Sequence, residues 1–380
     1  YMRLLRSTIA LLGAFIISAC AANQTPADST DNSGDAAGEV AFTVEEVLGG
    51  FNRPWSIAFL PSGAALVTER PGRLWLVEDG DRTGVTGVAS VAAVGQGGLL
   101  DIEIDPDFET NGLLYYSYSA SGSGGYGTSV DRARLVDTEL LDRTTIFTME
   151  PFTGGGRHFG SRLAFDANGH LLITIGDRGL QDPAQETSNH IGTTLRITTD
   201  GGVPSDNPFV GDPSVPDEIY SYGHRNAQGM VVDPRNGRIW QHEHGPRGGD
   251  EVNIVEPGVN YGWPVITYGT AYSGLPMGEG TEKPGMAQPV IHWTPSIAPS
   301  GMELYLGDLF PAWRGDLFVG ALAGTHLRRL EVDGTEIVSQ QVLLDGTHGR
   351  IRDVAEGPDG ALWFLTDAAS GGIFRIVPEE

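Results

Sequence analysis

Two side chains that could act as a base and its partner stand at the two ends of one predicted β-hairpin. His158 follows the glycines at 154–156, and Asp177 ends the second of two apolar runs, which the turn at 166–169 separates. An Asn-Gly turn between alternating apolar runs is a strong hairpin signal, and the ends of an antiparallel pair lie side by side. Taken singly, the histidine could bond a backbone carbonyl and the aspartate could cap a turn. Their predicted adjacency favours a working pair, in which a carboxylate orients an imidazole base.

A second group of side chains could bind an anion. Arg225, Asn226 and Gln228 lie close together between glycines, and Arg350 and Arg352 share one face of a predicted strand. A guanidinium group donates two parallel hydrogen bonds, which suits a carboxylate. Clustered arginines in an otherwise acidic chain therefore indicate a ligand that carries several carboxylates.

The segment 242–251 offers ligands for a metal ion. His242 and His244 share a strand face, but no third ligand stands nearby, so zinc is not predicted. Gly245-Pro246 leaves backbone carbonyls free to face outward, and Asp250-Glu251 adds carboxylates. Oxygen ligands of this kind suit a hard cation such as Ca²⁺.

A repeated pattern predicts the elements that hold these residues. Apolar alternation, a turn of Pro, Asp, Gly or Asn, and a second alternating strand recur in six places. The copies are 55–69, 101–118, 161–177, 229–243, 301–321 and 352–367. A period of roughly 45 to 75 residues is typical of propeller blades with inserts, whereas a sandwich would not repeat one motif at this spacing. We predict an all-β, six-bladed β-propeller in which the polar residues that precede the first strands converge on one mouth of the central channel.

The first residues indicate export. An apolar run at 9–17 follows Arg3 and Arg6 and precedes Cys20, the only cysteine in the chain. The pattern predicts a lipoprotein signal at 1–20 with lipidation at Cys20, a flexible tether at 21–40 and the propeller at 41–380. An ordinary secretory signal with a chance cysteine is the alternative. The expected location is the periplasm or cell surface, with the lipid anchor as the sole membrane contact.

The composition limits the partners. A net charge of −25, with 54 glycines and 23 prolines, describes an acidic chain rich in turns. Nucleic-acid binding needs a basic face, so no nucleic-acid partner is expected. One cysteine excludes an internal disulfide.

With these residues assembled, the chain resembles the soluble quinoprotein glucose/aldose sugar dehydrogenases, which use pyrroloquinoline quinone (PQQ). The resemblance covers roughly residues 44–377. The matching segments are Pro54-Trp55, 95–100, His158 with 160–163, Gly176-Asp177, 224–229, Gly245-Pro246, Asp250-Glu251 and 260–264. The family is a six-bladed propeller, as the repeat predicts. The resemblance implies oxidation of an aldose at C1 to a lactone, with PQQ and Ca²⁺ as cofactors and an electron acceptor that the sequence does not name.

The resemblance also implies a role for each site residue. His158 would take the proton of the C1 hydroxyl while hydride passes to C5 of the quinone, and Asp177 would orient the histidine. The main-chain carbonyls of Gly245 and Pro246 would hold Ca²⁺ against the cofactor. The residues implied to line the site or bind PQQ are Gln96, Arg225, Asn226, Gln228, Ser296, Arg350 and Arg352. Glu251 and the carbonyl of Tyr261 match a second, structural Ca²⁺ site.

The chain departs from the glucose enzymes at three positions. Arg157 stands where they carry an acidic residue, His244 replaces a glutamine, and Ala323 stands where they commonly have a cofactor-binding lysine.

The predicted propeller also fits two other functions. One is a Ca²⁺-dependent propeller that hydrolyses sugar lactones with side-chain ligands, and the other is a non-catalytic binding propeller at the cell surface.

Overall fold

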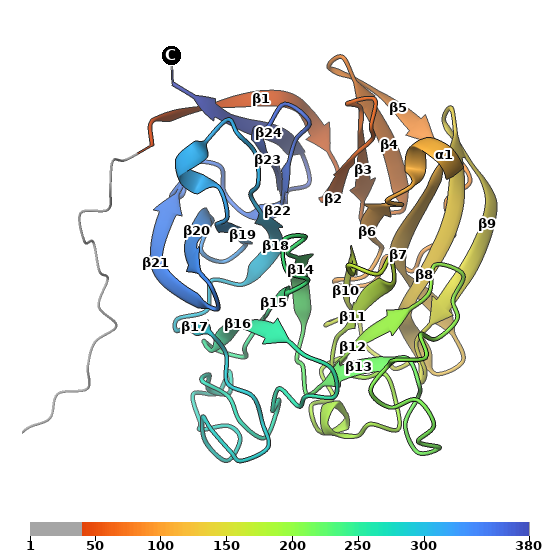
Figure 1. The fold of residues 1–380 in the computed structure, drawn as a ribbon, viewed down its shortest axis with the longest axis vertical. Helices are drawn as coiled ribbons and strands as arrows, with labels where there is room; N and C mark the ends of the chain where they lie inside the picture. Colours follow the sequence, from red (N-terminus) through yellow and green to blue (C-terminus); the bar gives the residue numbers. More distant parts are fainter. Residues whose placement is uncertain (1–39, 380) are drawn as a thin grey trace, which may run out of the picture. The chain divides into compact units, whose positions relative to one another are not determined.

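The computed structural model describes residues 40–379, in which nearly all of the regular structure is β-strand (Figure 1). The predicted signal at 1–20, with Cys20, and nearly all of the predicted tether lie outside the described residues. No helix in the described part of the chain is long and apolar enough to cross a membrane.

The strands form six four-stranded antiparallel sheets, so the predicted six-bladed propeller is confirmed. Blade 1 contains β2 (Pro54–Phe59), β3 (Ala65–Glu69), β4 (Arg73–Glu78) and β5 (Asp81–Val85); blade 2 contains β6 (Leu99–Ile104), β7 (Leu113–Gly122), β8 (Gly125–Val136) and β9 (Glu139–Thr148). Blade 3 contains β10 (Gly160–Phe165), β11 (Leu171–Ile175), β12 (Thr193–Ile197) and β13 (Ile219–Tyr222); blade 4 contains β14 (Ala227–Val232), β15 (Ile239–Glu243), β16 (Asp250–Val255) and β17 (Ile291–Trp293). Blade 5 contains β18 (Pro299–Leu304), β19 (Leu317–Ala321), β20 (His326–Asp333) and β21 (Glu336–Leu343); blade 6 contains β22 (Ile351–Glu356), β23 (Leu362–Thr366), β24 (Gly371–Pro378) and β1 (Phe42–Phe51). Short helical turns are α1 (Phe108–Asn111), η1 (Asp182–Gln185) and η2 (Pro311–Trp313).

The six sequence copies supply the first two strands of every blade. The first strands β2, β6, β10, β14, β18 and β22 contact one another in a closed ring. They surround an internal cavity of about 330 Å³. Their small, buried residues suit this position, because an inner strand is covered on both faces. The residues that precede these strands therefore gather at one mouth of the channel.

The two ends of the described chain close the ring. β1 pairs with β24, in a register that runs from Phe42 opposite Pro378 to Phe51 opposite Gly371. Blade 6 thus takes its outer strand from the N-terminal side and its other strands from the C-terminal side (Figure 1). Pairing these strands removes two free sheet edges.

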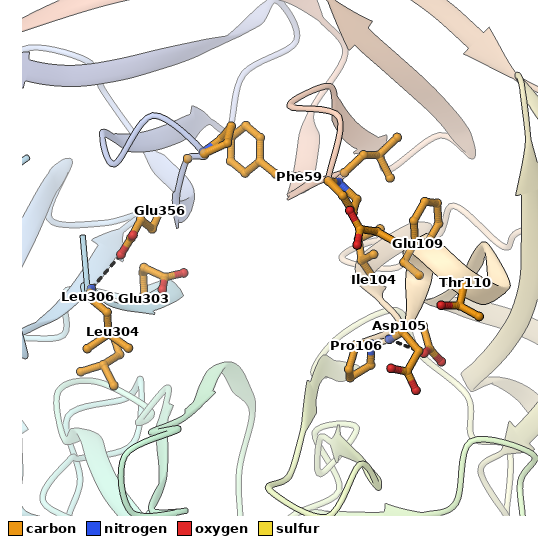
Figure 2. A pocket seen from close by; sticks show the side chains of 16 residues that line it. Phe59, Ile104, Asp105, Pro106, Glu109, Thr110, Glu303, Leu304, Leu306 and Glu356 are labelled. Atoms are coloured by element: carbon orange, nitrogen blue, oxygen red, sulfur yellow. Dashed lines mark hydrogen bonds between the residues drawn. The ribbon is translucent and has the colours of Figure 1, made fainter. Parts of the chain in front are cut away.

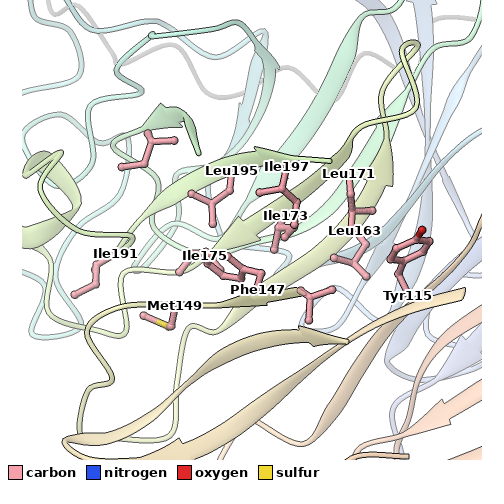
Figure 3. Close-up of a cluster of buried hydrophobic side chains, with 12 residues drawn as sticks. Tyr115, Phe147, Met149, Leu163, Leu171, Ile173, Ile175, Ile191, Leu195 and Ile197 are labelled. Carbon is pink, nitrogen blue, oxygen red and sulfur yellow. The ribbon is translucent and has the colours of Figure 1, made fainter. Parts of the chain in front are cut away.

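Apolar contacts between neighbouring sheets hold the blades. Figure 3 shows Tyr115 and Phe147 of blade 2 packed with Leu163, Ile173 and Leu195 of blade 3. All five are buried, and blades of a propeller gain stability from apolar faces of this kind. The packing fixes the inner strands and therefore the loops at their ends.

Candidate functional site

His158 and Asp177 meet at one end of the hairpin β10–β11, as predicted. Nδ1 of His158 lies 2.6 Å from Oδ1 of Asp177. Asp177 is fully buried, and His158 is 9% exposed. With Nδ1–H donated to the carboxylate, the lone pair of Nε2 is left to accept a proton, and Nε2 has no partner among residues 40–379.

The backbone around His158 is unusual. His158 has a φ of 53°, in the left-handed region that residues other than glycine rarely adopt. Its N–H donates to Oε1 of Gln96 at 2.7 Å, which ties this conformation to the loop before blade 2. The carbonyl oxygen of His158 would lie 2.0 Å from a Cβ at position 176, so Gly176 is needed for Asp177 to approach the ring.

The surroundings keep the histidine neutral and the aspartate charged. Burial lowers the pKa of His158 below its usual value. The hydrogen bond that His158 donates to Asp177 acts to raise this pKa, and the nearby charge of Arg225 lowers it further. Burial acts to raise the pKa of Asp177, but the hydrogen bonds from His158 and Gly179 bring it below its ordinary value. At neutral pH the pair is therefore an imidazole and a carboxylate, the state that a base requires.

The segment 224–228 adjoins this pair. The carbonyl of Arg225 accepts the N–H of Asp177 at 2.8 Å, and Oδ1 of Asn226 accepts the N–H of Gly160 at 3.1 Å. Nη1 of Arg225 donates to the carbonyl of His244 at 3.0 Å. Blade 4 is thereby bonded to blade 3 at the mouth of the channel.

The arginines of blade 6 reach the same mouth. Nη1 of Arg352 donates to Oε1 of Gln228 at 2.9 Å. Arg350 and Arg352 both contact one carboxylate, that of Asp367, at 3.3 Å. Arg70, to which no sequence motif points, also belongs to this cluster. Burial lowers its pKa, which also responds to the charges of Asp367 and Arg350.

Buried donors without partners gather at the mouth. They are Nε of Arg70, Nε of Arg225, Nε of Arg352 and Nδ2 of Asn226, which find no hydrogen-bond partner within residues 40–379. A buried donor without an acceptor is costly, so such groups mark a site where a ligand supplies acceptors. Three of these four donors belong to positively charged arginines, which fits a ligand with several carboxylates and carbonyls, as PQQ has.

The opposite end of the inner strands has the opposite charge. A cavity of about 710 Å³ lies there, with Glu303 and Glu356 on one side and Asp105 and Glu109 on the other (Figure 2). Burial, with the nearby charge of Glu356, raises the pKa of Glu303 to about 8. An anionic ligand is repelled from this acidic end, whereas the arginines of the candidate site lie at the basic mouth.

Gly245 and Pro246 offer oxygen ligands beside the arginines. Both residues are buried, and their carbonyl oxygens accept no hydrogen bond from any described residue. Asp250 fixes this turn by accepting the N–H of Gly245 at 2.8 Å. No cluster of three or more His, Cys, Asp or Glu side chains that could hold a metal occurs in the described part of the chain. A cation at this turn would therefore rely on main-chain oxygens, which are ligands that Ca²⁺ accepts.

Ser296 contacts Asp250. Its hydroxyl donates to the carboxylate of Asp250 at 2.7 Å, and the N–H groups of Ile297 and Ala298 bond the same carboxylate. Ser296 is thus joined to the turn that carries Gly245, and its role toward a cofactor stays a prediction.

Glu251 and Tyr261 lie on either side of one group of polar side chains. Glu251 is opposite Glu243 in the β15–β16 register. His224 bonds Glu243 at 2.9 Å and stacks on the ring of Tyr261 at 4.7 Å. Burial and the facing carboxylate of Glu243 raise the pKa of Glu251 well above its usual value. A cation beside Glu251 would relieve this repulsion.

Arg162 joins four blades beneath the mouth. Its guanidinium group donates to Asp101 at 2.8 Å, to Asp353 at 3.0 Å and to the carbonyl of Gln228 at 2.8 Å. No local sequence pattern predicts this role for Arg162, because the partners of an arginine inside an apolar strand come from distant segments of the chain.

Comparisons with known proteins identify the family of the chain. Residues 51–375 match the family model described as glucose/sorbosone dehydrogenase. The chain is 41% identical to aldose sugar dehydrogenase YliI of Escherichia coli, over 90% of this chain and 95% of that protein. A crystal structure of a glucose dehydrogenase is 46% identical, with a TM-score of 0.87, over 89% of this chain and all of that one. The PQQ-bound aldose sugar dehydrogenase of Streptomyces coelicolor is 28% identical, with a TM-score of 0.74, over 90% of this chain and all of that one. The chain therefore belongs to the glucose/sorbosone dehydrogenase family of oxidoreductases.

Proposed function

We propose that the protein uses PQQ and Ca²⁺ to oxidise aldose sugars at C1 to lactones and passes the electrons to a separate acceptor. The observation that carries the proposal is the neutral His158, held by Asp177, at a mouth where buried arginine and asparagine donors lack partners. The family membership supports an oxidoreductase, and the PQQ-bound relative supports the choice of cofactor.

Different residues of the chain would accept the proton, bind the cofactor and hold the metal ion. Nε2 of His158 accepts the proton of the C1 hydroxyl, and Asp177 stabilises the imidazolium that forms. When PQQ is bound, the chemistry that it supplies is acceptance of the hydride from C1. Arg225, Arg350 and Arg352 would bind its carboxylates through charge-assisted hydrogen bonds. Asn226 and Gln96 would border the same space. The carbonyls of Gly245 and Pro246 would hold Ca²⁺, which would supply Lewis-acid polarisation to the cofactor.

The alternatives have less support. A lactone hydrolase of this shape would hold its ion through side-chain ligands at the channel, and the described residues contain no group of three or more His, Cys, Asp or Glu side chains that could hold a metal. A binding propeller would not need a neutral base paired with a buried carboxylate.

Reconstitution tests the proposal. The purified protein is titrated with PQQ in the presence of Ca²⁺ and is then given a panel of aldoses with an artificial dye. Sugar-dependent dye reduction that requires both PQQ and Ca²⁺ is expected. Opening of sugar lactones by the protein without PQQ would favour the hydrolase, and absence of both activities in a PQQ-loaded protein would favour the binding module.

Asp177→Asn is expected to lower kcat clearly, but less than loss of the histidine does. The amide keeps a hydrogen bond to the ring and removes the negative charge that stabilises the imidazolium. Since that charge raises the pKa of His158, the acid limb of the pH–rate profile should move to lower pH. The measurement is kcat against pH at saturating PQQ. An acid limb that moves to higher pH would contradict this electrostatic role.

Cys20→Ser is expected to release the protein from the membrane fraction. We propose that the mature protein is a lipoprotein anchored through Cys20, because several acyl chains on one cysteine hold a protein stably at a bilayer. Fractionation of cells that express either form measures this. A Cys20→Ser protein that stays in the membrane fraction would rule out the lipid anchor.

A further inference from the structure

Trp263 reaches the catalytic pair from a distant loop. Its indole Nε1 donates to Oδ2 of Asp177 at 2.8 Å. Trp263 follows β16 in the connection to β17, whereas Asp177 follows β11 of blade 3. The indole is only 5% exposed, so water does not compete for this bond.

Each oxygen of the Asp177 carboxylate has its own partners. Oδ1 accepts Nδ1–H of His158 and the N–H of Gly179, both at 2.6 Å. Oδ2 accepts a hydrogen bond from Trp263 alone among residues 40–379. Because Asp177 is fully buried, removing the indole N–H would leave a charged oxygen without a donor. A carboxylate with one free oxygen can also rotate away from the histidine.

The indole itself is held firmly. The main-chain N–H of Trp263 donates to the carbonyl of Gly223 at 2.9 Å. The main-chain carbonyl of Trp263 accepts a hydrogen bond from Nε2 of Gln185 at 2.7 Å. The guanidinium group of Arg225 lies over the ring, 5.2 Å from its centroid. One side chain therefore contacts both the carboxylate of the catalytic pair and an arginine of the anion site.

We propose that Trp263 is a positioning residue, which fixes the Asp177 carboxylate for His158 and moderates its negative charge. The inference rests on the proposed function, because it assigns a role within that reaction. The charged and titratable groups that face the pair are Arg157, Arg178, Arg225 and His244. None of them donates to Oδ2 of Asp177, so the indole N–H is the donor that partly compensates the negative charge on that oxygen.

Trp263→Phe separates the hydrogen bond from the packing, because phenylalanine keeps a ring beneath Arg225 and removes the N–H. We expect kcat about tenfold lower, in line with loss of one hydrogen bond to a charged group, and a dissociation constant for PQQ within about twofold of the parent value. The acid limb should move to higher pH, because the less compensated carboxylate raises the pKa of His158. This direction is opposite to that expected for Asp177→Asn.

Trp293→Phe is the matched control. Trp293 is 6% exposed, its Nε1 donates to Oε1 of Gln340 at 2.8 Å, and Arg328 lies over its ring at 5.8 Å. This variant loses a comparable bond in the same blade and should keep the parent kcat and pH profile. An unchanged kcat and pH profile for Trp263→Phe would overturn the proposal, and so would a loss of PQQ affinity that matches the loss of kcat.

A measurement on the cofactor-free protein keeps the test independent of turnover. NMR titration of the His158 ring should give a higher pKa in Trp263→Phe than in the parent, and the same pKa in Trp293→Phe. Equal values in all three proteins would overturn the positioning role. Failure of the parent protein to oxidise any aldose would count against the proposed function instead, and the NMR result would still decide whether Trp263 acts on the pair.

Discussion

His158→Ala is expected to lower kcat by about 10²–10⁴-fold, the usual contribution of a positioned general base. The proton of the C1 hydroxyl must leave as hydride departs from C1, and Nε2 of His158 is the atom placed to take it. The loss should appear in kcat and in kcat/KM together, because the proton is transferred in the transition state. Steady-state kinetics on the PQQ- and Ca²⁺-loaded variant measure the effect.

His190→Ala supplies the control for this experiment. His190 is a buried histidine of the same blade, and its Nε2 lies 2.9 Å from Oε1 of Glu218. Its removal should lower the melting temperature and leave kcat near the parent value. The PQQ affinity of His158→Ala should also stay near the parent value, since the arginines remain. Turnover of aldoses by loaded His158→Ala at the parent rate would remove His158 from the mechanism.

Arg352→Ala is expected to weaken PQQ binding by about 10–100-fold, the range for loss of a hydrogen bond between charged groups. The side chain of Arg352 is 6% exposed, and its Nε has no partner among the described residues, so a ligand carboxylate would meet a desolvated donor. At saturating PQQ, kcat should change less than the dissociation constant does. Titration of the apoprotein by cofactor absorbance measures the affinity without turnover.

Arg375→Ala is the matched variant for this test. Arg375 lies on β24 of the same blade, where it bonds Glu45 at 2.7 Å and Asp359 at 3.0 Å on the outside of the sheet. Its removal takes away the same charge far from the mouth and should leave PQQ affinity unchanged.

Ala323→Lys should tighten PQQ binding, because Ala323 is exposed and follows Leu322, whose carbonyl accepts a hydrogen bond from Arg350. An unchanged titration in both Arg352→Ala and Ala323→Lys would contradict the assignment of the arginine cluster.

The inner part of each blade could be predicted because its signals are local. Apolar alternation around a tight turn marks both strands of a hairpin, and the inner strands are covered on both sides whatever the blade. Outer strands such as β5 and β21 are largely exposed on one or both faces, so many sequences suit them and no shared motif appears. The pairing of β1 with β24 joins the two ends of the described chain, and no local pattern specifies such a contact.

The same distinction applies to the site. His158 and Asp177 could be paired from the sequence because one hairpin joins them. Trp263 could not be placed on Asp177, because its loop belongs to another blade and its N–H direction depends on the whole ring of sheets. Arg70 ends a Thr-Glu-Arg run that looks like a solvated turn, and only the closed propeller brings it beside Asp367. The contacts of Trp263 with Asp177 and of Arg70 with Asp367 each join segments from different blades.

The most direct test of the account follows the bound cofactor itself. PQQ- and Ca²⁺-loaded protein is mixed rapidly with an aldose in the absence of dye, once with ordinary sugar and once with sugar that carries deuterium at C1. The account predicts that the sugar changes the absorbance of the cofactor in a single turnover, that deuterium slows this change, and that His158→Ala slows it much further. A fully loaded parent protein whose cofactor absorbance does not respond to any aldose would contradict the account.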